Sequence, residues 1–206
     1  MRVDDLIARV QPVKHGFGPM KVEAEAVVAG RTASESLDLA KNLLDSPVHQ
    51  ARMVGTFILG MISAQSPEAF ALLLETVSHD PDWRVQEILA MAFDIYCEQA
   101  GYETSLPVIK QWLSHTNPNL RRAASEGLRI WTARPYFREN PAVAISLLSA
   151  LRADPSAYVR KSAGNALRDI SRTYPDMVKQ ELAEWDLSDK RVLFTYRRAA
   201  RMLEGE

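Results

Sequence analysis

The chain of 206 residues lacks the features that mark secreted, membrane-spanning and metal-binding proteins. A single cysteine, Cys97, cannot form an internal disulfide. No apolar run reaches the roughly 18 residues that cross a bilayer, and charged residues interrupt the segment 1–13, where a signal peptide would have its apolar region. The histidines show no metal-ligand spacing. We therefore expect a cytoplasmic protein that uses neither a metal nor a cofactor.

Motifs for covalent or nucleotide chemistry are also missing. The sequence contains no Ser or Cys nucleophile motif, and apolar neighbours such as Phe93 and Tyr96 predict that Cys97 is a buried thiol. The segment 15–18 (HGFG) is too short, and not placed after a strand, to cradle a nucleotide phosphate. No segment has the two-residue period of a β-strand.

The overall charge is close to neutral, which at first argues against a nucleic-acid partner. The total conceals an asymmetry between the two parts of the chain. Residues 1–116 hold 9 Lys and Arg against 15 Asp and Glu, whereas residues 117–206 hold 16 against 11. The C-terminal part is therefore basic.

An internal repeat dominates what the sequence does contain. Three short Asp-Pro or Asn-Pro turns place proline at Pro81, Pro118 and Pro155, each 37 residues after the last. Every turn runs into a segment with apolar residues at i, i+4 and i+7 or i+8, which is one stripe of an α-helix. A second apolar helix follows each of these first helices.

A period of this length built from two helices is typical of stacked helical repeats, none of which buries its apolar face alone. We predict an all-α, HEAT-like helical-repeat superhelix, an α-α solenoid of about ten to twelve helices. The whole chain, 1–206, is expected to form one domain. The clearest repeats are 80–114, 117–151 and 154–185, and residues 20–44 are expected to form two further helices joined at 30–32.

Equivalent positions of stacked repeats lie side by side, so the alignment predicts which residues share a face. One column holds Glu87, Arg122 and Lys161, and one helical turn further on lie Met91, Glu126 and Asn165. Trp83 lies one turn before Glu87. An aromatic side chain and a carboxylate are thus expected on one stripe.

Cations recur on the first helices of successive repeats, and such a row can follow a phosphate backbone. Its members are Arg121, Arg122, Arg129, Arg160, Lys161, Arg168 and Arg172. Arg122 and Glu126 could equally form an ordinary surface ion pair, because they are i, i+4 neighbours.

The tryptophans divide into two pairs. Trp112 and Trp185 fall among apolar residues late in second helices, which predicts core positions. Trp83 begins a helix and Trp131 ends one, so these two are candidates for contact with a ligand.

Two segments, 120–129 (LRRAASEGLR) and 158–171 (YVRKSAGNALRDIS), resemble the AlkC/AlkD-type DNA alkylation repair glycosylases. The resemblance spans roughly residues 80–185. It implies a HEAT-like superhelix whose concave basic surface holds duplex DNA, and an enzyme that excises N3- or N7-alkylated purines. We expect the protein to act as a monomer.

The resemblance also implies roles for individual residues. Trp83 and Glu87 resemble the aromatic residue and the catalytic acid that the family presents on one helix, with Glu in place of the Asp of AlkD-type members. Arg122 resembles the arginine that faces this acid, and Glu126 resembles the acid of a Ser-Glu-Gly motif in AlkC-type members. Asn165 stands where AlkD-type members carry another tryptophan.

The remaining roles complete the expected site. Trp131 is expected to join Trp83 and Asn165 in contacting the base or sugar. The expected DNA-backbone contacts are Arg121, Arg129, Arg160, Lys161 and Arg168. Two other interpretations stay open at this point: a non-catalytic protein that binds damaged or branched DNA, and a HEAT scaffold for a protein partner.

Overall fold

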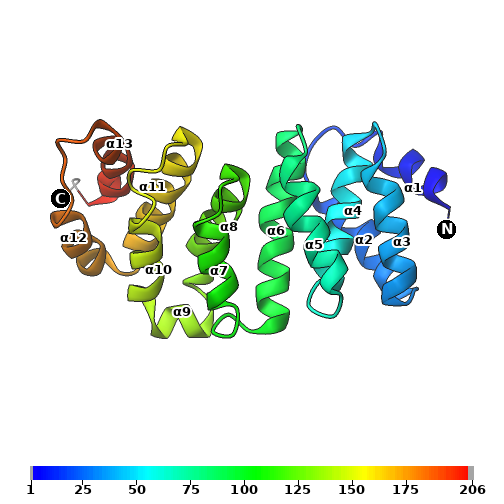
Figure 1. Cartoon of the computed structure of the whole chain (residues 1–206), viewed down its shortest axis with the longest axis horizontal. Helices are drawn as coiled ribbons and strands as arrows, with labels where there is room; N and C mark the ends of the chain where they lie inside the picture. Colours follow the sequence, from blue (N-terminus) through cyan, green and yellow to red (C-terminus); the bar gives the residue numbers. More distant parts are fainter. Residues whose placement is uncertain (1, 204–206) are drawn as a thin grey trace. The chain divides into compact units, whose positions relative to one another are not determined.

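Helices form all the regular secondary structure in the computed structural model, which describes residues 2–203, and no strand occurs in that range (Figure 1). The chain divides into two compact units, Met1–Gly101 and Tyr102–Glu206. The predicted all-α, HEAT-like fold is confirmed. The expectation that both units fold together as one domain stays a prediction.

The first unit consists of six α-helices and one 3-10 turn within its described residues. They are α1 (Val3–Val10), α2 (Gly18–Ala29), α3 (Ala33–Leu44), α4 (His49–Ile62), α5 (Pro67–Glu75), η1 (Val77–His79) and α6 (Trp83–Ala100). Helix α4 is the centre of this unit, since α2, α3, α5 and α6 all pack against it.

The second unit contains seven α-helices and one 3-10 turn within its described residues. They are α7 (Leu106–Leu113), α8 (Pro118–Trp131), α9 (Pro135–Glu139), α10 (Pro141–Ser149), α11 (Ala157–Ser171), α12 (Pro175–Ala183), α13 (Lys190–Ala199) and η2 (Ala200–Met202). Helix α11 packs against α8 on one side and α13 on the other.

The predicted pair of helices in 20–44 is confirmed, and local chemistry explains the break between them. The Thr32 backbone N–H donates to the Glu35 carboxylate at 2.9 Å, and the Glu35 N–H donates back to the Thr32 hydroxyl at 3.3 Å. This reciprocal capping box satisfies backbone donors at the start of α3.

The expected core positions of Trp112, Trp185 and Cys97 are also confirmed.

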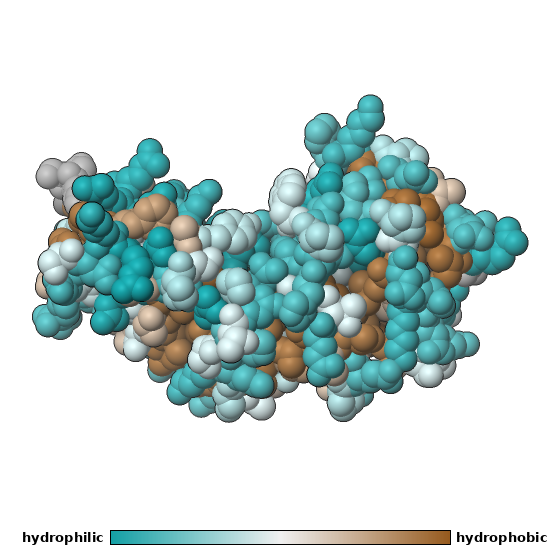
Figure 2. All heavy atoms as spheres, turned by 45° about the horizontal axis from the view of Figure 1, so that its top comes forward, coloured by the Kyte–Doolittle hydropathy of each residue, from teal (hydrophilic) through white to brown (hydrophobic). Residues whose placement is uncertain are grey.

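Close approach of α4 to α6 depends on a residue without a side chain. A Cβ added at Gly60 would lie 2.7 Å from both Cα and Cβ of Ala92. The two helix backbones therefore meet at this point, which sets the position of α6 and of the side chains on its outer face. Figure 2 shows hydrophobic atoms in patches over both units, one of them over the N-terminal helices, on an otherwise largely hydrophilic face.

Candidate functional site

Helix α6 presents a stripe of side chains that its core face does not use. The stripe consists of Trp83, Glu87 and Met91, spaced one turn apart. Trp83 is 61% exposed and Glu87 is half-buried, while Ile88, the next residue of the helix, is fully buried. Residues four apart on a helix have Cβ atoms about 5–6 Å apart. The predicted pairing of an aromatic ring with a carboxylate on one face of one helix therefore exists.

The start of α6 is held by a polar cap directly beside Trp83. Asp82 accepts from the backbone N–H of Arg84 at 2.9 Å and from its guanidinium at 2.7 and 2.8 Å. These hydrogen bonds lower the pKa of the Asp82 carboxyl to about 2. Asp82 is therefore ionised at neutral pH and stabilises the first turn, where a helix favours negative charge.

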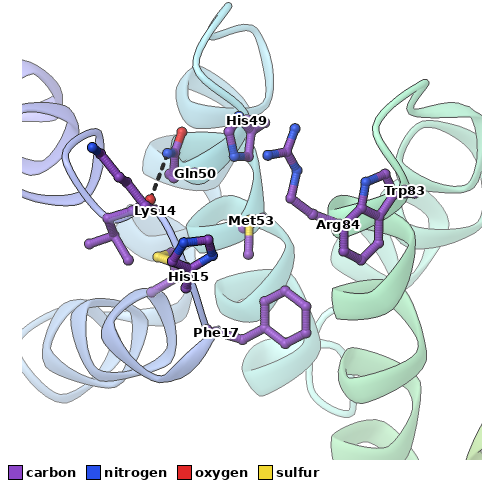
Figure 3. Close-up of a pocket in the computed structure, with 11 residues that line it drawn as sticks. Lys14, His15, Phe17, His49, Gln50, Met53, Trp83 and Arg84 are labelled. Carbon is purple, nitrogen blue, oxygen red and sulfur yellow. Dashed lines mark hydrogen bonds between the residues drawn. The ribbon is translucent and has the colours of Figure 1, made fainter.

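A pocket of about 300 Å³ lies beside Trp83 in the first unit (Figure 3). Its walls come from the loop between α1 and α2, from the first turns of α4 and from the start of α6. The labelled side chains around it are Lys14, His15, Phe17, His49, Gln50, Met53, Trp83 and Arg84. Sequence reasoning singled out only Trp83 here. The sequence signal for this pocket was the segment 15–18 (HGFG). It is too short to be a phosphate loop, but it forms part of the pocket wall.

One imidazole of the pocket differs from an ordinary histidine. Burial lowers the pKa of His49, and the positive charge of Arg84 contributes to the same direction. His49 is therefore neutral at pH 7 and can both donate and accept a hydrogen bond in the pocket.

In the second unit, Arg122 is held against an aromatic ring. Its guanidinium carbon lies 4.5 Å from the centroid of the Tyr158 ring on α11, and the residue is only 4% exposed. A cation over an aromatic face at this distance is a favourable contact. The sequence pattern placed Arg122 correctly on α8 but did not reveal Tyr158 as its partner.

Glu126 is engaged in a network between α8 and α11. Its carboxylate accepts from the Ser162 hydroxyl at 2.8 Å and from the Arg129 guanidinium at 2.9 Å. Ser162 in turn accepts from the Ser125 hydroxyl at 2.8 Å. Arg129 is thus one cation that binds Glu126, and the alternative that Glu126 also pairs with Arg122 stays a prediction.

Two of the cations expected to contact a DNA backbone have an acidic partner on α11. Asp169 accepts from Arg168 at 3.0 Å and lies 3.4 Å from the Nε of Arg129. Arg129 therefore bridges Glu126 and Asp169. Any phosphate that approached these cations would compete with carboxylates already in place.

Arg121 is a correction to the predicted row of backbone contacts, because it is buried in a structural role; Arg160 binds the turn before its own helix, and its contact with DNA stays a prediction. The Arg121 guanidinium is buried and donates to both carboxylate oxygens of Asp154, at 2.6 and 2.9 Å. It also donates to the carbonyls of residues 115 and 116 in the preceding turn. Arg160 donates to the carbonyls of residues 154 and 155, and its guanidinium lies 5.1 Å from the Phe194 ring.

The same arrangement occurs once more in the first unit, which identifies it as a feature of the repeat. Arg52 binds Asp80 at 2.6 and 3.1 Å and donates to the carbonyls of residues 46 and 47. Each of these arginines lies four residues after a helix N-cap and binds the turn that precedes its own helix. An arginine at this position of the repeat therefore stabilises the turn that precedes its own helix.

Trp131 is a second correction, because it is fully buried and offers no face to a ligand. Its ring lies 5.5 Å from that of Tyr102 and 5.9 Å from that of Phe137. Gly127, one turn earlier, leaves the space that the indole fills, since an added Cβ would be 2.5 Å from the ring. The five-residue helix α9 brings Phe137 to this cluster.

The remaining predicted residues lie on α11. Lys161 is exposed and forms no ion pair with any described residue, and Asn165 lies one turn further on, half-buried. The structure thus brings Trp83 and Glu87 together in the first unit and places Arg122, Glu126, Lys161 and Asn165 in the second. That Arg122 faces Glu87 stays a prediction.

Within residues 2–203, no cluster of three or more His, Cys, Asp or Glu side chains is arranged to hold a metal ion. Over the same residues, no helix combines the length and the apolar character needed to cross a membrane.

Several solved structures are similar to this chain. AlkD2 from Streptococcus mutans is 42% identical, covers 98% of both chains and superposes with a TM-score of 0.96. The smu.31 protein of Streptococcus mutans UA159 is 41% identical over 97% of this chain and 98% of its own, with a TM-score of 0.90. The alkylpurine DNA glycosylase AlkC of Pseudomonas fluorescens, bound to DNA with an abasic site analog, shares the fold at 23% identity and a TM-score of 0.53, over 91% of this chain and 61% of its own.

Sequence comparison gives a consistent result. The uncharacterized protein YhaZ of Bacillus subtilis is 36% identical over 87 residues, which are 40% of this chain and 24% of YhaZ. The family described as DNA alkylation repair enzyme matches residues 20–202. The chain therefore belongs to the DNA alkylation repair enzyme family.

Proposed function

We propose that the protein binds duplex DNA that carries N3- or N7-alkylated purines and hydrolyses the bond between the damaged base and its deoxyribose. The observation that carries this proposal is the pairing on α6 of an exposed indole, Trp83, with a carboxylate one turn away, Glu87. Membership of a DNA alkylation repair family supports the choice of substrate.

Glu87 is preferred to Glu126 as the acid for a physical reason. The Glu126 carboxylate already accepts hydrogen bonds from a serine and an arginine, so much of its charge is compensated within the protein. Glu87 lies instead on the same face of α6 as the exposed indole of Trp83, one turn away, so a sugar held against that ring would lie near its carboxylate. Arg122, on the ring of Tyr158, is better suited to hold α8 and α11 in register than to move toward a phosphate.

The reaction demands little of the protein, because a purine alkylated at N3 or N7 is already cationic. When the glycosidic bond breaks, its electron pair goes to the purine and the deoxyribose gains oxocarbenium character. A water molecule then adds to the sugar and releases a proton. A carboxylate about 4 Å from the sugar cation contributes roughly 4 kcal/mol at an effective dielectric constant of about 20, of which the part realised only in the transition state speeds the reaction.

The test is release of free base from methylated duplex DNA, measured by chromatography of the supernatant. We expect wild-type protein to release 7-methylguanine or 3-methyladenine. Glu87→Gln, which keeps the shape and removes the charge, should stop release while DNA affinity is retained, and Glu126→Gln should release base at a rate much nearer that of wild type. Absence of release by the wild type would contradict the catalytic part of the proposal.

A non-catalytic protein that binds damaged or branched DNA is the second candidate. It is favoured by the hydrogen bonds of Glu126, since the second candidate acid is then already bound within the protein and catalysis depends on Glu87 alone. A methylated and an unmethylated duplex, compared for binding as well as for base release, separate the two candidates.

Salt dependence separates both DNA functions from a scaffold for a protein partner. Counterion release predicts that the logarithm of DNA affinity falls with the logarithm of salt concentration by about 0.9 for each phosphate contacted. A flat response to salt would contradict both DNA functions.

A further inference from the structure

The pocket beside Trp83 has a preformed wall. Gln50, which is 8% exposed, donates from Nε2 to the carbonyls of Gln11 at 3.1 Å and Val13 at 3.0 Å. Gly16 has φ of 80°, a backbone conformation that other residues rarely adopt. The loop between α1 and α2 is therefore held in one shape, and that shape leaves the pocket open instead of filling it.

The floor of the pocket is apolar and its rim is aromatic. Met20 and Met53 line the pocket and are almost fully buried, and the ring of Phe17 lies on the same side of the pocket as Met53 (Figure 3). Trp83 and His15 are exposed at the rim. The other three tryptophans of the chain are buried, so Trp83 is the indole that can stack against a flat ligand.

The polar groups of the pocket favour an anionic ligand. Two cations, Lys14 and Arg84, and two imidazoles, of His15 and His49, line it, and no acidic side chain does so among the described residues. Arg84 is already bound to Asp82 at 2.7 Å. Lys14 is exposed and has no ion-pair partner among the described residues, so it supplies the positive charge that a phosphate would meet first.

The size of the pocket limits the ligand further. A volume of about 300 Å³ lies at the lower end of the range for small-molecule pockets. A single nucleoside with its phosphate is of suitable size, whereas a longer segment of a chain is not. Aromatic side chains that stack on single bases, together with cations for the phosphate, are how proteins hold unpaired nucleotides.

We propose that this pocket holds one unpaired nucleotide of a DNA strand, with its base stacked on Trp83 and its phosphate beside Lys14. The inference rests on the proposed binding of DNA and does not require glycosylase activity. A nucleotide within a strand is favoured over a free one because Trp83 shares its stripe on α6 with Glu87, so a strand that passes Glu87 is within one helical turn of the pocket. Lesions that weaken base pairing would present such a nucleotide at lower cost.

The experiment compares two fluorescent DNA probes of equal length, one fully paired and one with a single extrahelical 2-aminopurine. Anisotropy gives the affinity, and the 2-aminopurine emission reports stacking. We expect the protein to bind the probe with the unpaired base about tenfold more tightly and to quench its emission, because stacking of one base on an aromatic residue is worth an effect of this order.

Variants then assign the effect to the pocket. Trp83→Ala should lose both the preference and the quenching, and Trp83→Phe should recover part of each. Lys14→Ala should weaken binding of the unpaired probe, whereas Lys179→Ala, which removes an exposed cation on α12, should leave the preference unchanged. Thermal unfolding followed by circular dichroism confirms that the exposed substitutions leave the fold intact.

The outcomes separate the pocket from the wider proposal. Equal affinity for both probes, unchanged in Trp83→Ala, would overturn the nucleotide pocket and leave duplex binding standing. Binding of neither probe would overturn both. If free 2′-deoxyguanosine monophosphate binds with the same dependence on Trp83 while neither DNA probe does, the pocket takes a mononucleotide and the assignment to a DNA strand is wrong.

Discussion

Replacing Arg121 with alanine should destabilise the second unit without a specific effect on DNA. The Arg121 guanidinium makes two hydrogen bonds to Asp154 and two to backbone carbonyls, and both residues of the pair are buried. The Asp154 carboxylate also accepts from the backbone N–H of Ser156 at 2.8 Å. Removal of the arginine therefore leaves a buried carboxylate and two carbonyls without their strongest donor.

The magnitude follows from the burial of the pair. Loss of one partner of a buried ion pair costs about 3–5 kcal/mol, because the other charge stays buried without compensation. In a chain of this size, each kcal/mol lowers Tm by roughly 2–4 °C. We expect Arg121→Ala to unfold roughly 10 °C below the wild type. The double variant Arg121→Met with Asp154→Leu should recover part of this loss, since no lone charge remains.

Thermal unfolding followed by circular dichroism is the assay, and Lys161→Ala is the matched control. Lys161 lies on the same repeat motif but is exposed, so its loss should change stability by less than about 0.5 kcal/mol. DNA affinity at several salt concentrations is measured in parallel. If Arg121→Ala melts like the wild type and its salt slope falls by about 0.9, Arg121 contacts a phosphate as the sequence pattern predicted, and the structural assignment is wrong.

Three further predictions follow from the packing and the charges. Gly60→Ala should lower the free energy of unfolding by about 1–3 kcal/mol, because its Cβ would meet the α6 backbone at Ala92. Gly18→Ala is the control and should be nearly neutral, because no atom lies within 4 Å of the added Cβ. Equal melting temperatures of the two variants would contradict the close contact. The pKa of Asp82 is lowered to about 2, so its contribution to stability is complete above pH 3.8 and is lost as the pH falls through about 2. Asp82→Asn should lack this pH-dependent loss of stability, and an acid unfolding profile identical to that of the wild type would refute the prediction. The pKa of His49 is lowered from 6.5 by burial and by Arg84, so its contribution to stability should be complete above pH 6.5 and decrease as the pH falls below 6.5. His49→Gln should lose less stability over this range. Equal loss of stability by both proteins between pH 6.5 and 5 would contradict the prediction.

Much of the fold could be predicted from the sequence because helical repeats are encoded locally. The three proline turns mark the starts of α6, α8 and α11, and the apolar period identifies the face that each helix buries. The alignment also placed Trp83 and Glu87 on one stripe, since that relation depends only on helix geometry. The core positions of Trp112 and Trp185 could be read in the same way.

The roles of individual cations could not be read from the repeat. Arg121 and Arg122 are adjacent on one helix, yet the first binds Asp154, 33 residues away, and the second stacks on Tyr158. The motif contains no signal that distinguishes them, because the partner of each lies in another turn or helix. A row of basic residues therefore predicted a larger phosphate-binding surface than the ion pairs leave available.

Helix starts and shared helical faces were determined by the amino-acid sequence, because they depend on residues within about four positions of one another, and the repeat period could be read from the spacing of the proline turns. Tertiary structure alone decided that Trp131 is core, that Glu126 is bound by Arg129, and that a loop before α2 meets α4 and α6 around Trp83. These outcomes depend on which distant residues compete for the same space or the same hydrogen bond, and only the packed chain resolves that competition.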